Sequence, residues 1–194
     1  MNRILKINHL AIDAYASLAE GMPEGMLEIH RYVYDGIVTS LKSKQCNELY
    51  EQNLSKILGV VNLEKKHGFD AVDDFECPTE VYEYKPSCNK KSPSGTINDD
   101  SIAKIEKCER LKDEDKTGWL VLGGIDKEKF RFDCIYKFPL HIYSEDRRNY
   151  LAALKEKNKN QEKQTRSTYA LSVKKSIELC EQLQEEYYVW ERGK

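Results

Sequence analysis

Residues 68–85 read GFDAVDDFECPTEVYEYK, and this stretch decides how the middle of the chain folds. Its two halves, 69–73 and 79–85, are short and rich in aromatic and β-branched residues. A small turn that contains Pro78 separates them. This pattern predicts two antiparallel strands joined as a hairpin.

The register of the hairpin follows from its turn. If the chain turns symmetrically about residues 76 and 77, Asp70 lies opposite Glu83, and Val72 lies opposite Val81. Directly opposed residues of an antiparallel pair share one face of the sheet, with their Cβ atoms ~4.5–5.5 Å apart. The two carboxylates are therefore expected to meet although they are far apart in the sequence.

Alternation along the strand places Lys85 on the same face as Glu83. Opposed carboxylates repel each other, so a sequence that pairs them is expected to hold a cation between them. Carboxylate oxygens suit Mg²⁺, which keeps several waters and often binds substrate phosphate as well. A neighbouring ammonium group can orient water or stabilise charge on a phosphorus centre. Together these features indicate metal-assisted hydrolysis of a phosphodiester.

Asp70 followed by Glu83-Tyr84-Lys85 resembles the PD-(D/E)XK motif of restriction-endonuclease-like nucleases. One position departs from the motif, because Phe69 stands where the family often has proline. The resemblance covers roughly residues 45–172. It implies an αβββαβ core, Asp70, Glu83 and Lys85 as catalytic residues, and Asp70 and Glu83 as ligands of Mg²⁺, for which Mn²⁺ can substitute.

Two assignments within this motif stay open. The resemblance implies that a glutamate on the preceding helix completes the metal site, and Glu51 and Glu48 are the candidates, with Glu51 preferred. A bulge or a one-residue slip would also exchange the roles of Asp70 and Asp73.

Outward from the hairpin, the sequence predicts helices followed by strands and then further helices. Apolar residues at helical spacing indicate helices over 9–19, 25–41, 46–61, 99–111, 146–157 and 172–190. Asp99 or Asp100 is the expected cap of the fourth. Further strands are expected over 118–123 and 130–136, after a loop over 90–95, in a mostly antiparallel meander.

These elements predict a mixed α/β (α+β) fold with a central mixed β-sheet flanked by helices. A single nuclease domain is expected over 1–194. It consists of N-terminal helices over 1–44, a catalytic core over 45–172 and a C-terminal helix over 173–194.

The charge distribution favours nucleic-acid binding at one place. The net charge is −2, yet residues 147–175 hold nine basic residues and two acidic ones. A surface that tracks phosphates has this composition. Arg166 is the arginine best suited to contact guanine. The expected DNA-binding residues are Lys90, Lys91, Arg147, Arg148, Lys159, Lys163 and Arg166.

Other classes of protein are disfavoured by composition. No apolar stretch approaches the ~20 residues that span a bilayer, and the first 18 residues lack a continuous apolar segment of an export signal. The six cysteines form no CxxC or CxxH pair, which favours free thiols in a reducing cytoplasm over a zinc site.

The sequence therefore predicts a Mg²⁺-dependent endonuclease that acts on double-stranded DNA, most similar to a type II restriction enzyme. A homodimer is expected, because a two-fold protein matches a palindromic site. The alternatives are a repair or recombination nicking nuclease of the same fold, and a non-catalytic nucleic-acid-binding protein.

Overall fold

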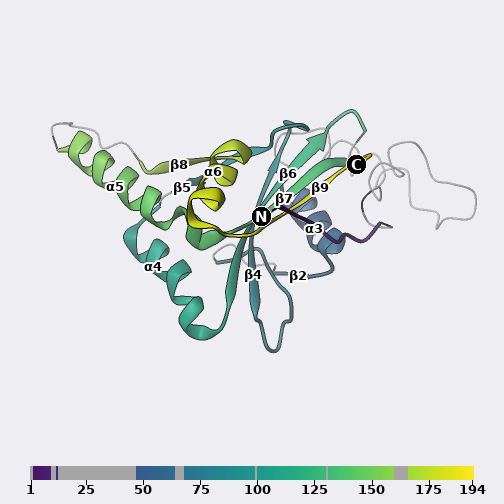
Figure 1. Cartoon of the computed structure of the whole chain (residues 1–194), viewed down its shortest axis with the longest axis horizontal. Coiled ribbons are helices and arrows are strands. Elements are labelled where there is room, and N and C mark those ends of the chain that lie inside the picture. The colour runs from purple at the N-terminus through teal and green to yellow at the C-terminus, as the bar shows by residue number, and fades with distance from the viewer. Residues whose placement is uncertain are drawn as a thin grey trace, which may run out of the picture.

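A seven-stranded mixed sheet forms the centre of the computed structural model, which describes residues 2–9, 12, 47–63, 68–98, 100–129, 131–159 and 166–194 (Figure 1). The strand order is β1-β9-β7-β6-β4-β3-β2. In chain order these strands are β1 (Asn2–Ile4), β2 (Val61–Asn62), β3 (Ala71–Val72), β4 (Glu80–Ser87), β6 (Thr117–Asp126), β7 (Arg131–Pro139) and β9 (Tyr187–Glu191).

The described residues also form four α-helices and a small second sheet. The helices are α3 (Asn47–Leu58), α4 (Ile102–Arg110), α5 (Ser144–Asn158) and α6 (Val173–Leu183), with 3-10 turns η1 (Lys112–Glu114) and η2 (Leu140–Tyr143). None of these helices is long and apolar enough to cross a membrane. The helices predicted over 9–19 and 25–41 fall almost entirely outside the described residues.

Both faces of the large sheet are covered, because alternate side chains of β6 pack in two different core clusters. Trp119 and Val121 pack in one core cluster with Leu54 of α3, whereas Leu120 and Leu122 pack in a second cluster against η2 and β8. Figure 1 shows α3 on one side of the sheet and α4, α5 and α6 grouped on the other. The expectation of a mixed sheet flanked by helices is confirmed.

Strands β4 and β6 run parallel, although the sequence predicted a mostly antiparallel meander. Their register pairs Glu83 with Leu120 and Lys85 with Leu122. Parallel strands require a crossover connection, usually through a helix, and α4 lies in the chain between these two. The long pairing fixes β4 firmly within the sheet.

The structure also contains a small sheet that the sequence analysis did not predict, in which β5 (Ser94–Asn98) pairs antiparallel with β8 (Thr168–Ser172). The loop predicted over 90–95 is therefore too long, because a strand begins at Ser94. Strand β5 alternates between exposed and half-buried residues. Its mostly small and polar sequence lacks the apolar pattern that predicts a strand.

The predicted C-terminal helix over 172–190 is wrong in its second half. Helix α6 ends at Leu183, and Gln184 adopts a left-handed conformation with φ 56° that terminates it. The chain then enters β9, which includes Tyr187, Tyr188 and Trp190 and pairs with both β1 and β7. Aromatic and β-branched residues favour a strand here.

The cap of α4 also differs from the prediction. Ser101 is the N-cap, and its Oγ accepts a hydrogen bond from the Lys104 amide at 3.3 Å. Asp100 instead forms a buried ion pair with Arg147 of α5. Its Oδ2 accepts from Arg147 Nε at 2.9 Å, and its Oδ1 accepts from Nη2 at 2.5 Å. The pair joins α5 to the segment that precedes α4.

We expect Asp100→Asn to lower the free energy of unfolding by roughly 3–5 kcal/mol, because it leaves a buried guanidinium without its counter-charge. Urea denaturation measures this change. Asp113→Asn, at an exposed aspartate of η1, is the matched control and should change stability by less than about 0.5 kcal/mol. Equal stability of the two variants would contradict a structural role for the pair.

Candidate active site

The hairpin of β3 and β4 has the register that the sequence predicts. Val72 pairs with Val81, and Ala71 pairs with Tyr82. Just before β3, the Asp70 amide donates to the Tyr82 carbonyl at 2.8 Å, which is offset by one residue from the register of the strands, as at a β-bulge. The predicted pairing of Val72 with Val81 is confirmed, whereas Asp70 lies outside the paired residues, near enough to Glu83 for the charge of Glu83 to raise the pKa of Asp70.

Asp73 belongs to the turn of the hairpin. Its Oδ1 accepts hydrogen bonds from the amides of Thr79 and Glu80, both at 2.9 Å. Burial by itself would raise the pKa of Asp73, but the hydrogen bonds from Thr79 and Glu80 outweigh it and lower that pKa. This carboxylate is committed to closing the turn, so the alternative in which Asp73 replaces Asp70 is not supported.

The Asp70 carboxylate is hydrogen-bonded to β4, and its surroundings disfavour its ionised form. Its Oδ2 accepts a hydrogen bond from the Tyr84 amide at 2.6 Å. Burial, followed by the negative charge of Glu83, raises the pKa of Asp70 to about 7, although the Tyr84 amide and Lys85 oppose the shift. Near neutral pH the group is therefore poised between its protonated and ionised forms.

Lys85 lies beside Glu83 on the same face of β4. Its Nζ is 2.5 Å from Glu83 Oε1, and the two side chains are 22 % and 24 % exposed. The stem of Lys85 packs against Gly95 of β5, where an added Cβ would come within 2.9 Å of the Lys85 Cβ. A larger residue at Gly95 would therefore displace the lysine, so β5 helps to position it.

Helix α3 brings a third carboxylate to this group. Burial raises the pKa of Glu51, with Lys85 opposing this shift and Glu83 adding to it. One turn later, Ser55 Oγ and the Tyr84 hydroxyl are 3.0 Å apart in the core, which ties α3 to β4. Of the two predicted candidates, Glu51 is therefore the one whose charge acts on the site, and Glu48 acts on Glu51.

The chemistry of these groups fits a magnesium ion. In the described part of the chain, no three carboxylate, imidazole or thiol groups converge as a complete metal cage. Mg²⁺ does not need such a cage, because one or two carboxylates, waters and substrate phosphates commonly hold it. Asp70 and Glu83 could each offer a carboxylate oxygen to such an ion, with the charge of Glu51 acting on the same group. Burial, followed by the negative charge of Glu83, raises the pKa of Asp70, and a cation bound beside the group would favour its ionised form.

A cleft of about 420 Å³ opens beside Glu83 and Lys85. Its other walls come from the segment around Phe69, from β5, from α4 and from Arg147 of α5. We call it the basic cleft, since Lys104 and Lys107 of α4 also line it. Neither of these lysines was singled out from the sequence, although their i, i+3 spacing places them on one helix face.

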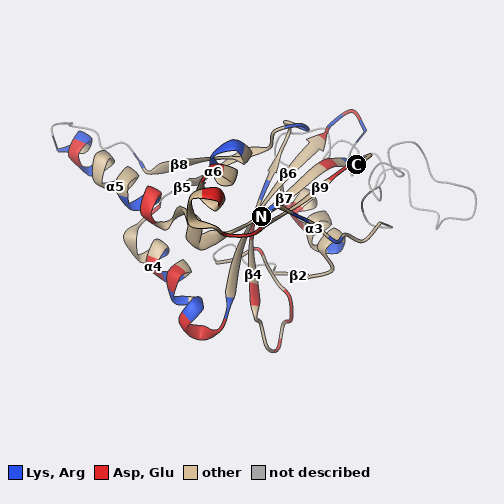
Figure 2. Ribbon diagram, viewed as in Figure 1, with Lys and Arg blue, Asp and Glu red and all other residues tan. Residues whose placement is uncertain are grey.

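Within 147–159 and 166–175, the described parts of the stretch expected to track phosphates, several basic side chains are buried or paired with carboxylates. Arg147 is 2 % exposed and bound to Asp100, so its predicted place on an exposed surface is wrong. Arg148 pairs with Glu109, and Lys175 lies 2.5 Å from Asp146. Figure 2 accordingly shows acidic and basic residues interspersed along α4 and α5.

The remaining predicted DNA-binding residues are scattered. Lys159 pairs with Glu156 at 2.6 Å, and Lys90 pairs with Asp126 at 3.0 Å. Lys91 and Arg166 are exposed, and Lys163 lies outside the described residues. These positions therefore do not gather with Glu83 and Lys85 in the way that Lys104 and Lys107 do.

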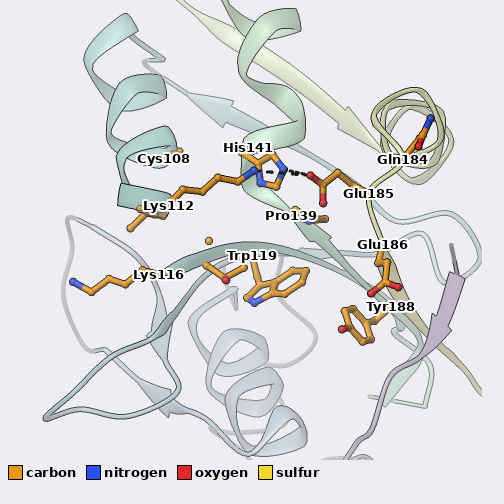
Figure 3. Close-up of a pocket in the computed structure, with 13 residues that line it drawn as sticks. Cys108, Lys112, Lys116, Trp119, Pro139, His141, Gln184, Glu185, Glu186 and Tyr188 are labelled. Atoms are coloured by element: carbon orange, nitrogen blue, oxygen red, sulfur yellow. Dashed lines mark hydrogen bonds and ion pairs between the residues drawn. The ribbon is translucent and has the colours of Figure 1, made fainter. Parts of the chain in front are cut away.

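A second cleft, of about 430 Å³, lies where β6, β9 and η2 meet (Figure 3). His141 Nε2 and Glu185 Oε1 are 2.8 Å apart at its wall, and Lys112 lies 3.9 Å from the same carboxylate oxygen. This cleft has a similar size but, unlike the basic cleft, it is not lined by Glu83 and Lys85. The presence of Glu83 and Lys85, and not the cleft volume, is therefore the reason for placing the candidate active site at the basic cleft.

The chain matches no family model, no curated protein and no solved structure. The functional argument therefore rests on the residues and geometry of the site.

The raised pKa of Asp70 predicts a pH-dependent stability. Ionisation of this group is penalised in the folded protein, so the penalty is absent below about pH 4 and complete above about pH 7. Asn at position 70 keeps an oxygen for the Tyr84 amide but removes the charge. At about 1.4 kcal/mol per pKa unit, reduced by partial exposure, we expect Asp70→Asn to stabilise the metal-free protein by roughly 1–3 kcal/mol at pH 8.

The measurement is urea denaturation in EDTA at pH 4.5 and pH 8. The stabilisation should be much smaller at pH 4.5, and the Asp113→Asn control should show no such difference. Equal effects of Asp70→Asn at both pH values would mean that Asp70 ionises normally.

Proposed function

We propose that this protein is a Mg²⁺-dependent endonuclease that hydrolyses DNA phosphodiester bonds through a PD-(D/E)XK site. The observation that carries the proposal is the proximity of Asp70, hydrogen-bonded to the Tyr84 amide, to Glu83 and Lys85 on β4, with Lys85 bound to Glu83 and the pKa of Asp70 raised to about 7. Strongly perturbed titratable groups beside a cleft are typical of catalytic sites.

The order of elements supports the same proposal. From α3 onward the chain runs α3, β2, β3, β4, α4 and β6 through the large sheet, with β5 diverted into the small sheet. Without β5 this is the αβββαβ order that the motif implies. The hairpin β3–β4 carries the three catalytic candidates within that order.

Each residue has a distinct role in the proposed reaction. Asp70 and Glu83 would hold the metal, with Glu51 as a third carboxylate close by, and Mn²⁺ is expected to substitute. A bound Mg²⁺ supplies Lewis-acid stabilisation of phosphate oxygens and activates water. Lys85 supplies a fixed positive charge that orients water and stabilises negative charge as the phosphorus centre is attacked. Gly95 and β5 position that charge.

Within this chemistry, a sequence-specific type II restriction endonuclease that cuts double-stranded DNA as a homodimer is the form we favour. One chain carries one such site, and a two-fold dimer would cut both strands of a palindrome. The alternatives are a repair or recombination nicking nuclease and a non-catalytic nucleic-acid-binding protein.

Plasmid cleavage with Mg²⁺ and with EDTA separates these functions. Discrete linear fragments would support a restriction enzyme, and a nicked circle would support a nicking nuclease. Binding without any cutting would favour the non-catalytic protein and contradict an active site at Asp70 and Glu83.

We expect Asp70→Asn and Glu83→Gln each to reduce the cleavage rate by at least about 100-fold, because each removes a ligand charge needed for transition-state stabilisation. DNA binding without metal should persist or become tighter, since repulsion of phosphate falls. Glu76→Gln, at the exposed tip of the same hairpin, is the matched control and should cut normally. Asp73→Asn should reduce the cleavage rate much less than Asp70→Asn. A larger loss of cleavage in Asp73→Asn than in Asp70→Asn would contradict the assignment of Asp70 as a metal ligand.

Substitutions of Lys85 test whether it acts through its charge. Lys85→Arg keeps a cation and should retain measurable cleavage, whereas Lys85→Met should be nearly inactive. Single-turnover cleavage rates with saturating Mg²⁺ provide the comparison. Equal inactivity of the two variants would instead indicate proton transfer by the lysine or a strict steric requirement.

A further inference from the structure

The small sheet of β5 and β8 has one face in the core and one face open to solvent. Tyr169 and Leu171 of β8 are buried in a core cluster, against which Ile97 of β5 also packs. The residues that alternate with these lie on the opposite face, because successive side chains of a strand point to opposite sides. We call this opposite face the ribbon face. Its exposed residues are Ser94, Thr96, Asn98, Thr168 and Ala170.

The ribbon face carries only short, uncharged side chains. Neither β5 nor β8 contains a charged residue, although 33 % of the chain is charged. Exposed edge strands are commonly protected by charged side chains, above all lysine. Here the side chains are instead the methyl group of Ala170 and the hydroxyl and amide groups of Ser, Thr and Asn, which both donate and accept hydrogen bonds. Such a face can approach a hydrogen-bonding surface closely without the cost of desolvating a charge.

The ribbon face adjoins the candidate catalytic group. Thr96 and Asn98 line the basic cleft together with Glu83 and Lys85. The stem of Lys85 also packs against Gly95 of the same strand β5. A ligand that lies along the ribbon face therefore extends directly to the candidate active site.

The charges around the ribbon face favour a long anionic ligand. The face itself has no carboxylate to repel such a ligand. The exposed residues Lys91 and Arg166 precede β5 and β8, respectively. Because the two strands are antiparallel, these two cations lie toward opposite ends of the ribbon, where they can meet the backbone of a polyanion that passes over it.

We infer that the β5–β8 ribbon enters the major groove of double-stranded DNA and contacts base edges through Thr96, Asn98 and Thr168. The inference rests on the proposed nuclease function and assigns the surface that would select its sequence. The major groove of B-form DNA admits a two-stranded β-ribbon, whereas the deep, narrow major groove of an RNA duplex does not. Asparagine amides pair with adenine, threonine hydroxyls pair with several bases, and the methyl groups of threonine and alanine contact that of thymine.

The first test measures binding of a fluorescent mixed-sequence DNA duplex in EDTA by anisotropy. Thr168→Glu places a carboxylate on the ribbon face and should weaken binding about tenfold or more at 0.1 M salt, because it repels the phosphates. Thr117→Glu is the matched control, since it makes the same change at the exposed first residue of β6 in the large sheet. Its affinity should stay within about twofold of the wild type. Thermal denaturation should show that both variants fold, since both threonines are exposed.

The second test asks whether the ribbon reads base pairs, and it uses neutral substitutions that leave the charge unchanged. Repeated binding in EDTA selects duplexes from a pool with a randomised centre. The wild type should enrich one sequence, whereas Asn98→Ala and Thr96→Ala should each relax the preference at one base pair by about tenfold. Thr117→Ala is the control and should select the same sequence as the wild type.

The outcomes separate this inference from the proposed function. Cleavage of DNA by the wild type, combined with unchanged binding and selection in the ribbon variants, would overturn the ribbon assignment and leave the nuclease standing. Weaker binding and relaxed selection would support the ribbon even if the wild type cuts nothing with Mg²⁺. Equal affinity for an RNA duplex of the same sequence would overturn the assignment to the major groove. Competition by netropsin, which occupies the minor groove, without competition by methyl green, which occupies the major groove, would overturn it as well.

Discussion

Pairing of β3 with β4 in one particular register is the constraint on which the candidate site depends. A one-residue slip would send Asp70 to the opposite face of the sheet from Glu83. Two features hold the register. The Asp73 carboxylate closes the turn through the amides of Thr79 and Glu80, and Val72 and Val81 are both buried. With the turn closed in this way, Asp70 is held against β4 by the Tyr84 amide, where the charge of Glu83 acts on it.

The proximity of Asp70 and Glu83 brings two carboxylates together, and two features reduce the repulsion between them. Glu83 is neutralised by Lys85, whereas Asp70 tends to hold a proton, with its pKa raised to about 7. Glu51 adds a further negative charge from α3. In the proposed nuclease, a divalent cation would displace the proton and share the charge of Glu83, so that Lys85 becomes free to act on the substrate.

Local features of the sequence predicted the β3–β4 hairpin better than they predicted the sheet around it. The hairpin, its register and α3 follow from patterns within about 20 residues of one another. By contrast, the pairing of β4 with β6, and that of β5 with β8, join distant segments, and alternation along a single strand does not identify its neighbour. Arg147 illustrates the same difficulty. Its neighbours in sequence are basic and exposed, yet the bond to Asp100 places it in the core.

The position of β9 has a consequence for how the molecule assembles. Strand β9 lies between β7 and β1, and Asn2 pairs in parallel with Tyr187. Closing a loop of that length carries an entropic cost before any contact offsets it, so β1 is expected to dock late in folding. Until it does, β9 presents an unpaired edge on which the equivalent strand of another molecule can add. At high protein concentration, pairing of β1 with the β9 of another chain can therefore compete with closure within one chain.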